Sequence, residues 1–249
     1  MYKPIIKTRE ELLLLRENPF GLTRLPEEEI FHWFSLLEAG WTHDGDPKMP
    51  HAELTSGLCS SGFFDCLRVL KYVNLSEILA HQLALKLLDE CMKDGGFPGV
   101  QWVLGSPMAA ITFAHDVAKF TGVPINMFLE KDPSNSKRLL WNRMVIPEDE
   151  PILQVEELIT TAHTTNEVER AVREGNVREG SPNPVTFAPY VGALVHRPPK
   201  MVEKYGDRKI VALISKEVWA GTPDQCPLCK AGSARVRPKQ NWAKLTGKS

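Results

Sequence analysis

Two adjacent carboxylates followed by several threonine hydroxyls are the residues of this chain whose types and spacing best suit chemistry. Glu156 and Glu157 close an apolar run. The hydroxyls that follow belong to Thr160, Thr161, Thr164 and Thr165. Carboxylates accept hydrogen bonds from a diol or help to hold a divalent cation. Hydroxyls near the unpaired N–H groups of a helix start bind anions, above all phosphate. A diol beside a phosphate predicts a sugar phosphate as the ligand.

The elements that must position these groups are a strand and a helix. Ile152, Leu153 and Val155 suit a buried strand, and Thr164 has the capping-box spacing to Glu167, which predicts that a helix begins there. An ordinary strand–loop–helix joint with surface charges is the alternative interpretation of this segment alone.

A second joint of the same kind lies earlier in the chain. Residues 102–104 predict a short strand, and a helix is predicted to run to about Thr121. The loop between them, a second candidate anion site, comprises Ser106, Pro107, Met108, Ala109 and Ala110. A plain helix start after a strand is the alternative.

The rest of the chain alternates between helices and strands. Pro26 before three glutamates predicts a helix start, and the apolar face that follows predicts packing against the main domain or a second subunit. A helix is predicted over residues 74–93, with a capping box from Asn74 to Glu77 and an end at Gly95 and Gly96. Strands are predicted over residues 124–129, 190–195 and 208–218, with polar loops at 130–138 and 180–189.

This alternation predicts an α/β fold, a mostly parallel sheet flanked by helices, with ligands at the carboxyl ends of the strands. The 249 residues, 43% of them hydrophobic, can bury one substantial core. A formal net charge of −1 gives no general attraction to nucleic acid or membrane. With no apolar run that could span a bilayer and no secretory segment at the N-terminus, the expected location is the cytoplasm. Five cysteines, an odd number, do not suggest a disulfide framework.

The stretch from Ile152 to Thr165 resembles the phosphoribosyl pyrophosphate signature of type I phosphoribosyltransferases, in which two acidic residues precede a Thr-Thr-Gly-type loop. The acidic pair here is Glu-Glu, and Ala162 and His163 stand where the family most often has glycines. The loop from Ser106 resembles the family's pyrophosphate loop, but both central glycines are alanines. Alanine is less favourable than glycine wherever φ must be positive, so an altered loop shape or weaker binding is expected.

Other segments resemble orotate phosphoribosyltransferases in particular. The hairpin predicted over residues 51–66 resembles the family's segment whose aromatic pair reaches the pyrimidine, which implies that Phe63 and Phe64 contact the base. Arg197, at a strand end, is placed to bind the orotate carboxylate as a bidentate donor. Lys131 matches the first lysine of the catalytic loop, but Glu130 replaces an arginine there. The alternatives are a hydrophobic hairpin, a surface arginine and a solvated charged loop.

Cys226 and Cys229 form a Cys-Pro-Leu-Cys motif followed by a basic tail. Some bacterial orotate enzymes carry a similar motif. One such pair supplies half of a structural zinc site, and spacing does not identify the other ligands. From residue 225 onward there are six basic residues and no acid, and a solvated C-terminus is expected.

The resemblance implies an orotate phosphoribosyltransferase, which joins orotate to phosphoribosyl pyrophosphate and gives orotidine 5′-phosphate and pyrophosphate. Glu156 and Glu157 would hold the ribose hydroxyls, the Thr160–Thr164 loop the 5′-phosphate, and the Ser106–Ala110 loop the pyrophosphate. Mg²⁺ would act with Lys131 on the leaving group, without a metal site made by protein side chains alone. A homodimer is expected.

The sequence predicts three parts of the chain. They are a helical N-terminal extension (1–45), the α/β domain with a small hood (46–225) and the motif with its basic tail (226–249). A phosphoribosyltransferase for another base and a non-catalytic nucleotide-binding regulator on the same fold remain alternatives.

Overall fold

A six-stranded sheet forms the centre of the protein, whose computed structural model describes residues 3–16, 18–93 and 99–247. In order across the sheet, the strands are β13 (Lys204–Tyr205), β14 (Arg208–Ser215), β12 (Phe187–His196), β9 (Ile152–Ile159), β5 (Trp102–Gly105) and β6 (Ile125–Phe128). The five strands from β14 to β6 run parallel to one another, and only the short edge strand β13 is antiparallel to its neighbour. The predicted mostly parallel α/β sheet is confirmed.

The register of the sheet brings the predicted site segments to one edge. Gly105, the last residue of β5, pairs with Val155 of β9, and His196 at the end of β12 pairs with Ile159. The loops that begin at Ser106, at Thr160 and at Arg197 therefore leave the same carboxyl edge of the sheet.

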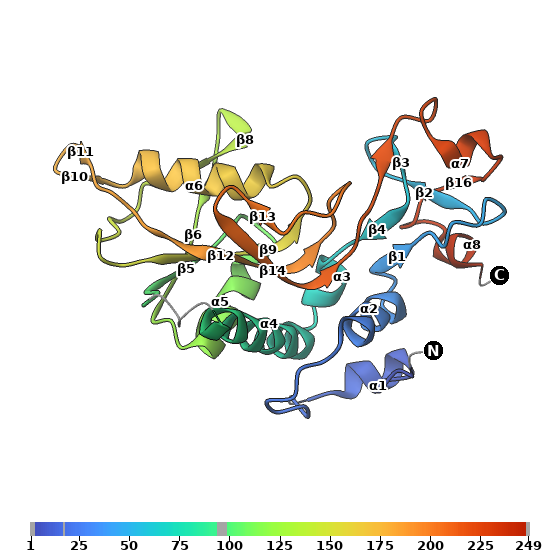
Figure 1. Ribbon diagram of the computed structural model, residues 1–249, viewed down its shortest axis with the longest axis horizontal. Helices are drawn as coiled ribbons and strands as arrows, with labels where there is room; N and C mark the ends of the chain where they lie inside the picture. Colours follow the sequence, from blue (N-terminus) through green and yellow to red (C-terminus); the bar gives the residue numbers. More distant parts are fainter. Residues whose placement is uncertain (1–2, 17, 94–98, 248–249) are drawn as a thin grey trace.

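Helices cover both faces of the sheet (Figure 1). The long helix α4 (Val73–Lys93) and α5 (Ala110–Thr121) pack together on one face, and α6 (His163–Gly175) covers the other. The larger apolar core lies between the sheet and α4 and α5, and a smaller one lies under α6. A short helix, α3 (Leu67–Leu70), leads into α4. The core residues of α4 and α5 recur at helical spacing, which is why these segments were predictable as helices.

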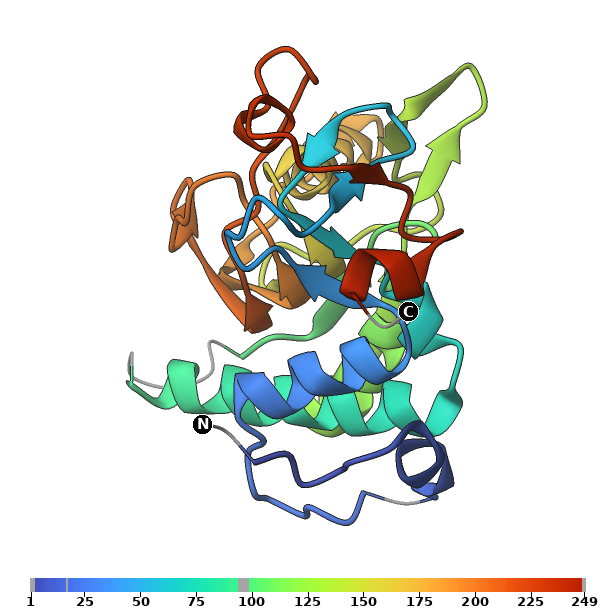
Figure 2. The ribbon, with the colours of Figure 1, turned by 90° about the vertical axis from the view of Figure 1, so that its right-hand side faces the viewer.

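The N-terminal segment is held against this body. It contains α1 (Arg9–Leu14), capped by Thr8, and α2 (Glu27–Leu36), which begins after Pro26 as predicted. The predicted apolar face of α2 is buried and consists of Ile30, Trp33, Phe34 and Leu37. Buried Glu29 accepts hydrogen bonds from the backbone N–H groups of Ile5 and Ile6. Figure 2 shows these helices alongside α4. Packing on the main domain is thus the role of this face.

Both predicted capping boxes are wrong. Helix α4 begins at Val73, and the side chain of Asn74 instead donates to the carbonyl oxygen of Leu15. Helix α6 begins at His163 without a side-chain cap, and Glu167 accepts from the backbone N–H of Leu139. Tertiary partners compete here with the local cap. The predicted end of α4 at Gly95 and Gly96 lies outside the described residues.

A smaller unit, which we call the hood (residues 40–64 and 220–247), sits beside the carboxyl edge (Figure 1). One of its sheets has the order β15 (Ala220–Gly221), β3 (Cys59–Ser60), β2 (His51–Glu53) and β16 (Arg235–Val236), and the other pairs β1 (Gly40–Thr42) with β4 (Gly62–Phe64). The short helices α7 (Pro227–Lys230) and α8 (Trp242–Thr246) complete it. The hairpin predicted over residues 51–66 is confirmed by the antiparallel pairing of β2 with β3.

The expectation of a solvated C-terminus is wrong for the described residues. Strand β16 pairs in parallel with β2, and Val236 and Leu245 are buried. The prediction failed because the partner strand lies about 180 residues earlier, a distance over which pairing has no local sequence signal.

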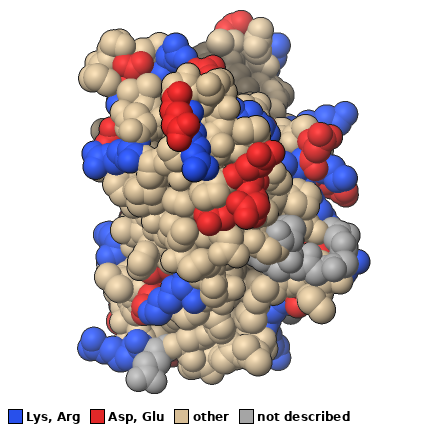
Figure 3. Space-filling model, turned by 90° about the vertical axis from the view of Figure 1, so that its left-hand side faces the viewer, with Lys and Arg blue, Asp and Glu red and all other residues tan. Residues whose placement is uncertain are grey.

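The polar loop predicted over residues 130–138 forms a hairpin, in which β7 (Glu130–Asp132) pairs with β8 (Asn135–Leu140). The loop predicted over residues 180–189 begins in a second hairpin, where β11 (Ser181–Pro182) pairs with β10 (Val177–Arg178), and its last residues belong to β12. No helix among the described residues is long and apolar enough to cross a membrane. On the face shown in Figure 3, the described basic side chains are interspersed with acidic ones and form no continuous basic surface.

Candidate active site

The two adjacent carboxylates of β9 occupy different environments. Side chains of a strand alternate between its faces, so Glu156 and Glu157 point in opposite directions. Glu156 is 1% exposed and accepts a hydrogen bond from Gln154 Nε2 at 2.6 Å, and Ser106 Oγ lies 2.5 Å from its other oxygen. Glu157 keeps part of its surface exposed. The buried carboxyl therefore supports the Ser106 loop, and the other remains partly accessible to solvent.

Burial controls the charge of this pair. It raises the pKa of the Glu156 carboxyl to about 8, against the opposing hydrogen bond from Ser106. Burial also raises the pKa of Glu157. Near neutral pH Glu156 therefore holds a proton for most of the time, which limits the negative charge beneath the anion loops.

The threonine-rich segment turns sharply between β9 and α6. Ala162 adopts the left-handed conformation, with φ of 57°, and α6 starts at the next residue. Thr160 is fixed by its carbonyl oxygen, which accepts a hydrogen bond from the Tyr205 hydroxyl at 2.6 Å. Exposed Thr161, His163 and Thr164 lie around the first turn of α6. The threonine hydroxyls and the N–H groups of that turn are donors of the kind that bind anions.

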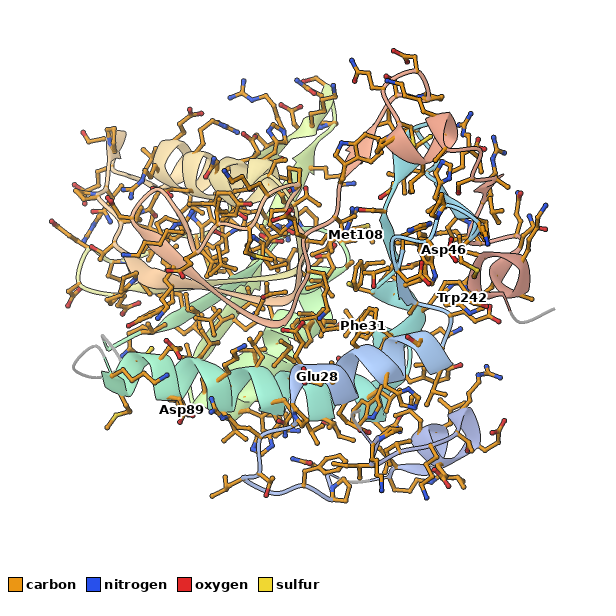
Figure 4. All side chains as sticks on the ribbon, turned by 45° about the vertical axis from the view of Figure 1, so that its right-hand side comes forward. Glu28, Phe31, Asp46, Asp89, Met108 and Trp242 are labelled. Atoms are coloured by element: carbon orange, nitrogen blue, oxygen red, sulfur yellow. The ribbon has the colours of Figure 1, made fainter. Side chains whose placement is uncertain are left out.

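The Ser106 loop has the same construction between β5 and α5. A Cβ atom on Gly105 would lie 2.8 Å from the carbonyl oxygen of Ala110, so only glycine allows this close approach. Ala109 has a regular helical φ of −71°, and Ala110 is the first residue of α5. Neither alanine has a positive φ, so neither carries the steric cost that alanine has in that conformation. Met108 is 76% exposed at the tip of the loop (Figure 4).

A cavity of about 490 Å³ opens between the hood and the carboxyl edge of the sheet. It brings together three residues that sequence reasoning assigned to the base, Phe63, Phe64 and Arg197. Its remaining lining residues are Glu53, Leu54, Thr55, Ser56, Asp65, Arg237, Pro238, Lys239 and Gln240. Neither anion loop contributes to this lining, but the backbone N–H of Arg197 donates to Ile159 at 2.8 Å, directly before the threonine loop. The cavity is therefore adjacent to the threonine loop.

Arg197 lines this cavity and contains an unsatisfied buried donor. Its Nε is buried, and no described group forms a hydrogen bond with it. Burial lowers the pKa of the guanidinium, but arginine keeps its charge in proteins. A buried charged donor without a partner is unfavourable, and an arginine on a cavity wall suits an anionic ligand.

The C-terminal segment supplies residues that sequence reasoning missed. Arg237 pairs with Glu53 at 3.1 Å, and Lys239 pairs with Asp65 at 2.8 Å. In Figure 4, Trp242 of α8 lies in the hood. Its ring is oriented edge-on to the ring of Phe63, with 6.3 Å between the two ring centroids. The cluster of basic residues after residue 225 was the available signal. It was interpreted as a tail because nothing local indicates its pairing with residues 51–53.

Lys131 is not among the lining residues. It lies exposed in β7, opposite Leu139 of β8. The surrounding hairpin is attached by ion pairs of Glu130 with Arg143 and of Arg138 with Glu174. Cys226 and Cys229 lie in the hood, outside the cavity lining.

Comparison with known proteins matches these observations. No family model matches the chain. The orotate phosphoribosyltransferase of Pelotomaculum thermopropionicum is 33% identical over 189 residues, which cover 76% of this chain and 87% of that protein. The orotate phosphoribosyltransferase of Desulforamulus reducens is 30% identical over 199 residues, covering 80% of this chain and 92% of that protein.

Solved structures with a detectable likeness include the orotate phosphoribosyltransferase of Aeropyrum pernix, with 17% identity, a TM-score of 0.41 and coverage of 65% of this chain and 83% of that one. The Leishmania donovani UMP synthase gives 14% identity, a TM-score of 0.49 and coverage of 88% and 42%. The sequence relatives, with identity of 30% or more over most of both chains, decide the assignment. This chain belongs to the orotate phosphoribosyltransferase family and is a phosphoribosyltransferase, a glycosyltransferase enzyme.

Proposed function

We propose that the protein transfers the phosphoribosyl group of phosphoribosyl pyrophosphate to orotate, giving orotidine 5′-phosphate and pyrophosphate. The observation that carries this proposal is that Arg197, whose Nε has no hydrogen-bond partner, lines one cavity together with Phe63 and Phe64. Orotate is a flat ring with a carboxylate. Aromatic side chains suit the ring, and a guanidinium suits the carboxylate.

The sugar phosphate would bind at the end of β9. The 5′-phosphate would be held by the turn from Thr160 to Thr164 and by the N-terminus of α6. Glu157, which is partly exposed, would accept hydrogen bonds from the ribose hydroxyls. Glu156 is buried against Ser106 in this conformation, so its contribution would pass through that hydroxyl.

The pyrophosphate would bind at the Ser106–Ala110 loop, where the first N–H groups of α5 and the Ser106 hydroxyl are donors. In the reaction a ring nitrogen of orotate, having lost its proton, forms a bond to C1′ of the ribose, and the bond from C1′ to the pyrophosphate oxygen breaks. The electron pair of that bond leaves with pyrophosphate. Lys131 would stabilise this charge if the β7–β8 hairpin closes over the site.

Mg²⁺ bound to the pyrophosphate would supply further charge stabilisation. Among the described residues, the only group of three or more side chains close enough to hold a metal ion lies in the hood and includes three cysteines. Such ligands do not suit magnesium, which prefers oxygen. The ion would therefore enter with the phosphate groups of the substrate. We also propose a homodimer, as the family resemblance implies.

The experiment is a comparison of orotate with uracil as acceptors, in the presence of phosphoribosyl pyrophosphate and Mg²⁺. Uracil has the same ring without the carboxylate, so it tests the role assigned to Arg197 directly. We expect formation of orotidine 5′-phosphate and pyrophosphate in equal amounts and little turnover of uracil. Absence of turnover with orotate, together with turnover of a purine or of uracil, would show that the enzyme acts on another base.

A further inference from the structure

Four potential metal ligands from distant parts of the chain meet in the hood. His51 lies in β2, Cys59 lies in β3, and Cys226 and Cys229 flank the first turn of α7. Their ligand atoms all lie within 4.8 Å of one another. The first three side chains are buried and Cys229 is partly exposed. The two ligands that the Cys-Pro-Leu-Cys motif lacks are thus provided by the hairpin of residues 51–60.

The spacing of these atoms fits tetrahedral coordination of one metal ion. With zinc–sulfur bonds of about 2.3 Å and zinc–nitrogen bonds of about 2.0 Å, tetrahedral angles place two sulfurs about 3.8 Å apart and a sulfur and a nitrogen about 3.5 Å apart. Cys59 Sγ and Cys229 Sγ are separated by 3.6 Å. His51 Nε2 lies 3.4 Å from Cys229 Sγ and 3.6 Å from Cys226 Sγ. These three distances match three of the six edges of such a tetrahedron, and the remaining ligand atoms lie within 4.8 Å of one another.

The imidazole of His51 is held in the tautomer that a metal requires. Ser233 Oγ donates its only proton to the carbonyl oxygen of Met49, at 2.6 Å. Ser233 Oγ also lies 2.8 Å from His51 Nδ1. Because its proton is already donated to Met49, Ser233 Oγ must accept here, and Nδ1 is the donor. Nε2 then carries the lone pair, and it faces the cysteine sulfurs. Metal-binding histidines are commonly oriented by such an outer hydrogen bond.

The two cysteines of the motif are also in direct contact. The backbone N–H of Cys229 donates to Cys226 Sγ at 3.3 Å. A disulfide does not account for the cluster, because the 3.6 Å between Cys59 and Cys229 far exceeds a sulfur–sulfur bond of about 2.05 Å. No disulfide joins any of the five cysteines, all of which lie among the described residues.

We propose that His51, Cys59, Cys226 and Cys229 bind one Zn²⁺ ion in a closed, four-ligand structural site. Three cysteines and a histidine form one of the common structural zinc sites, with no position left for a substrate. The ion joins the β2–β3 hairpin to α7. Strand β16 follows α7 and carries Arg237 and Lys239 to the cavity wall, so the metal fixes the part of the hood that covers the cavity.

The first test is the metal content of the purified full-length protein, measured by elemental mass spectrometry after gel filtration. We expect one zinc per chain in the parent and in Cys91→Ala, which removes a buried cysteine outside the cluster. Cys59→Ser and Cys229→Ser should lower the zinc content by at least about tenfold, since each loses one of four ligands. Less than one-tenth of an equivalent of metal in the parent, or stoichiometric iron in place of zinc, would overturn the proposal.

Because a cluster variant could fail to fold, the parent protein provides a second test. Exchange of its metal for Co²⁺ should give the absorption of a tetrahedral cobalt ion together with thiolate-to-cobalt charge-transfer bands. Modification of the thiols should release one zinc per chain, detected with a chromogenic chelator. A cobalt spectrum of an octahedral ion without sulfur ligands, or a disulfide within the cluster after isolation under reducing conditions, would contradict the site. None of these readouts depends on turnover of orotate.

Discussion

The Ser106 hydroxyl lies 2.5 Å from the buried carboxyl of Glu156, which joins the loop after β5 to the acidic end of β9. The connection continues below the loops, since Gln154 donates to Glu156 and accepts from Arg208 Nη1 at 2.8 Å. A single network of buried polar groups thus connects the Ser106 loop to β9, the strand that leads into the threonine loop. Because the central carboxyl has a raised pKa, the stability of this network depends on pH.

We predict that Glu156→Gln flattens the pH dependence of stability. Burial raises the pKa of this carboxyl from 4.5 to about 8. The folded protein is therefore most stable, with respect to this group, below pH 4.5, and it loses that stability as pH rises through about 8, because the buried carboxyl must then ionise. The amide imitates the protonated acid, donating toward Ser106 and accepting from Gln154. At about pH 9 the variant should be more stable than the parent by on the order of 3 kcal/mol, with little difference near pH 5. Denaturant unfolding across this range measures the effect.

The matched control for this variant is Glu148→Gln, which changes an exposed glutamate. Its stability should follow that of the parent at every pH. Parallel curves for the parent and Glu156→Gln would show that Glu156 ionises normally in the folded protein.

Ala162→Gly should stabilise the protein. The left-handed φ of 57° at Ala162 is unfavourable for any residue with a Cβ atom by roughly 1 to 2 kcal/mol, of which the greater freedom of glycine in the unfolded chain cancels a part. We expect a gain of about 0.5 to 1 kcal/mol in the free energy of unfolding. Ala109→Gly is the control, because its φ of −71° suits alanine. That change should lower stability by about 0.4 to 1 kcal/mol. Destabilisation of equal size at both positions would contradict the argument.

The conformations of these two alanines also show what sequence could predict. Ala109 and Ala162 both stand where the resembled family often has glycine, yet only Ala162 has a positive φ. Residue type alone does not distinguish them, because φ at each position is set by the path between a strand and its helix. The strands themselves were predictable. Short, mostly apolar segments such as residues 152–155 of β9 predict strands, and parallel strands place the polar loops that follow them at one edge.

Contacts between distant segments were not predictable in this way. The side chain of Asn74 bonds to Leu15, although it has the local spacing of a cap. Cys226 and Cys229 meet His51 and Cys59 from about 170 residues away, and the spacing of one pair does not identify the other. The cavity residues assigned from resemblance converge, whereas Lys239, which pairs with Asp65, was overlooked. Local patterns indicate secondary structure, and tertiary pairing decides which side chains share a site.

Arg197→Lys should raise the KM for orotate with little change in the KM for phosphoribosyl pyrophosphate. Lysine keeps the positive charge but loses the planar pair of donors that fits a carboxylate. A charge-assisted hydrogen bond contributes about 1.5 to 3 kcal/mol, so the KM for orotate should rise about 10- to 100-fold. Steady-state kinetics with each substrate varied in turn measures both constants.

Arg24→Lys provides the control for this change, because Arg24 forms an ion pair with Asp89 on the body of the protein and does not line the cavity. Its two KM values should equal those of the parent. A rise in the KM for phosphoribosyl pyrophosphate as large as that for orotate would indicate that Arg197 supports the fold of the site and does not recognise the carboxylate.

Lys131→Ala tests the role of the β7–β8 hairpin in turnover. Lys131 is exposed and lies away from the cavity lining, so its removal should leave the binding of both substrates largely intact. If the ammonium group stabilises charge on the departing pyrophosphate, kcat should fall by about 100-fold, as for the loss of one preorganised donor.

Lys137→Ala is the control. It removes an exposed lysine from β8 of the same hairpin and should change kcat by less than about twofold. Initial rates at saturating substrate, with dissociation constants from equilibrium binding, separate the two effects. An unchanged kcat in Lys131→Ala would exclude this lysine from the chemical step, and equal losses in both variants would point to the net charge of the hairpin.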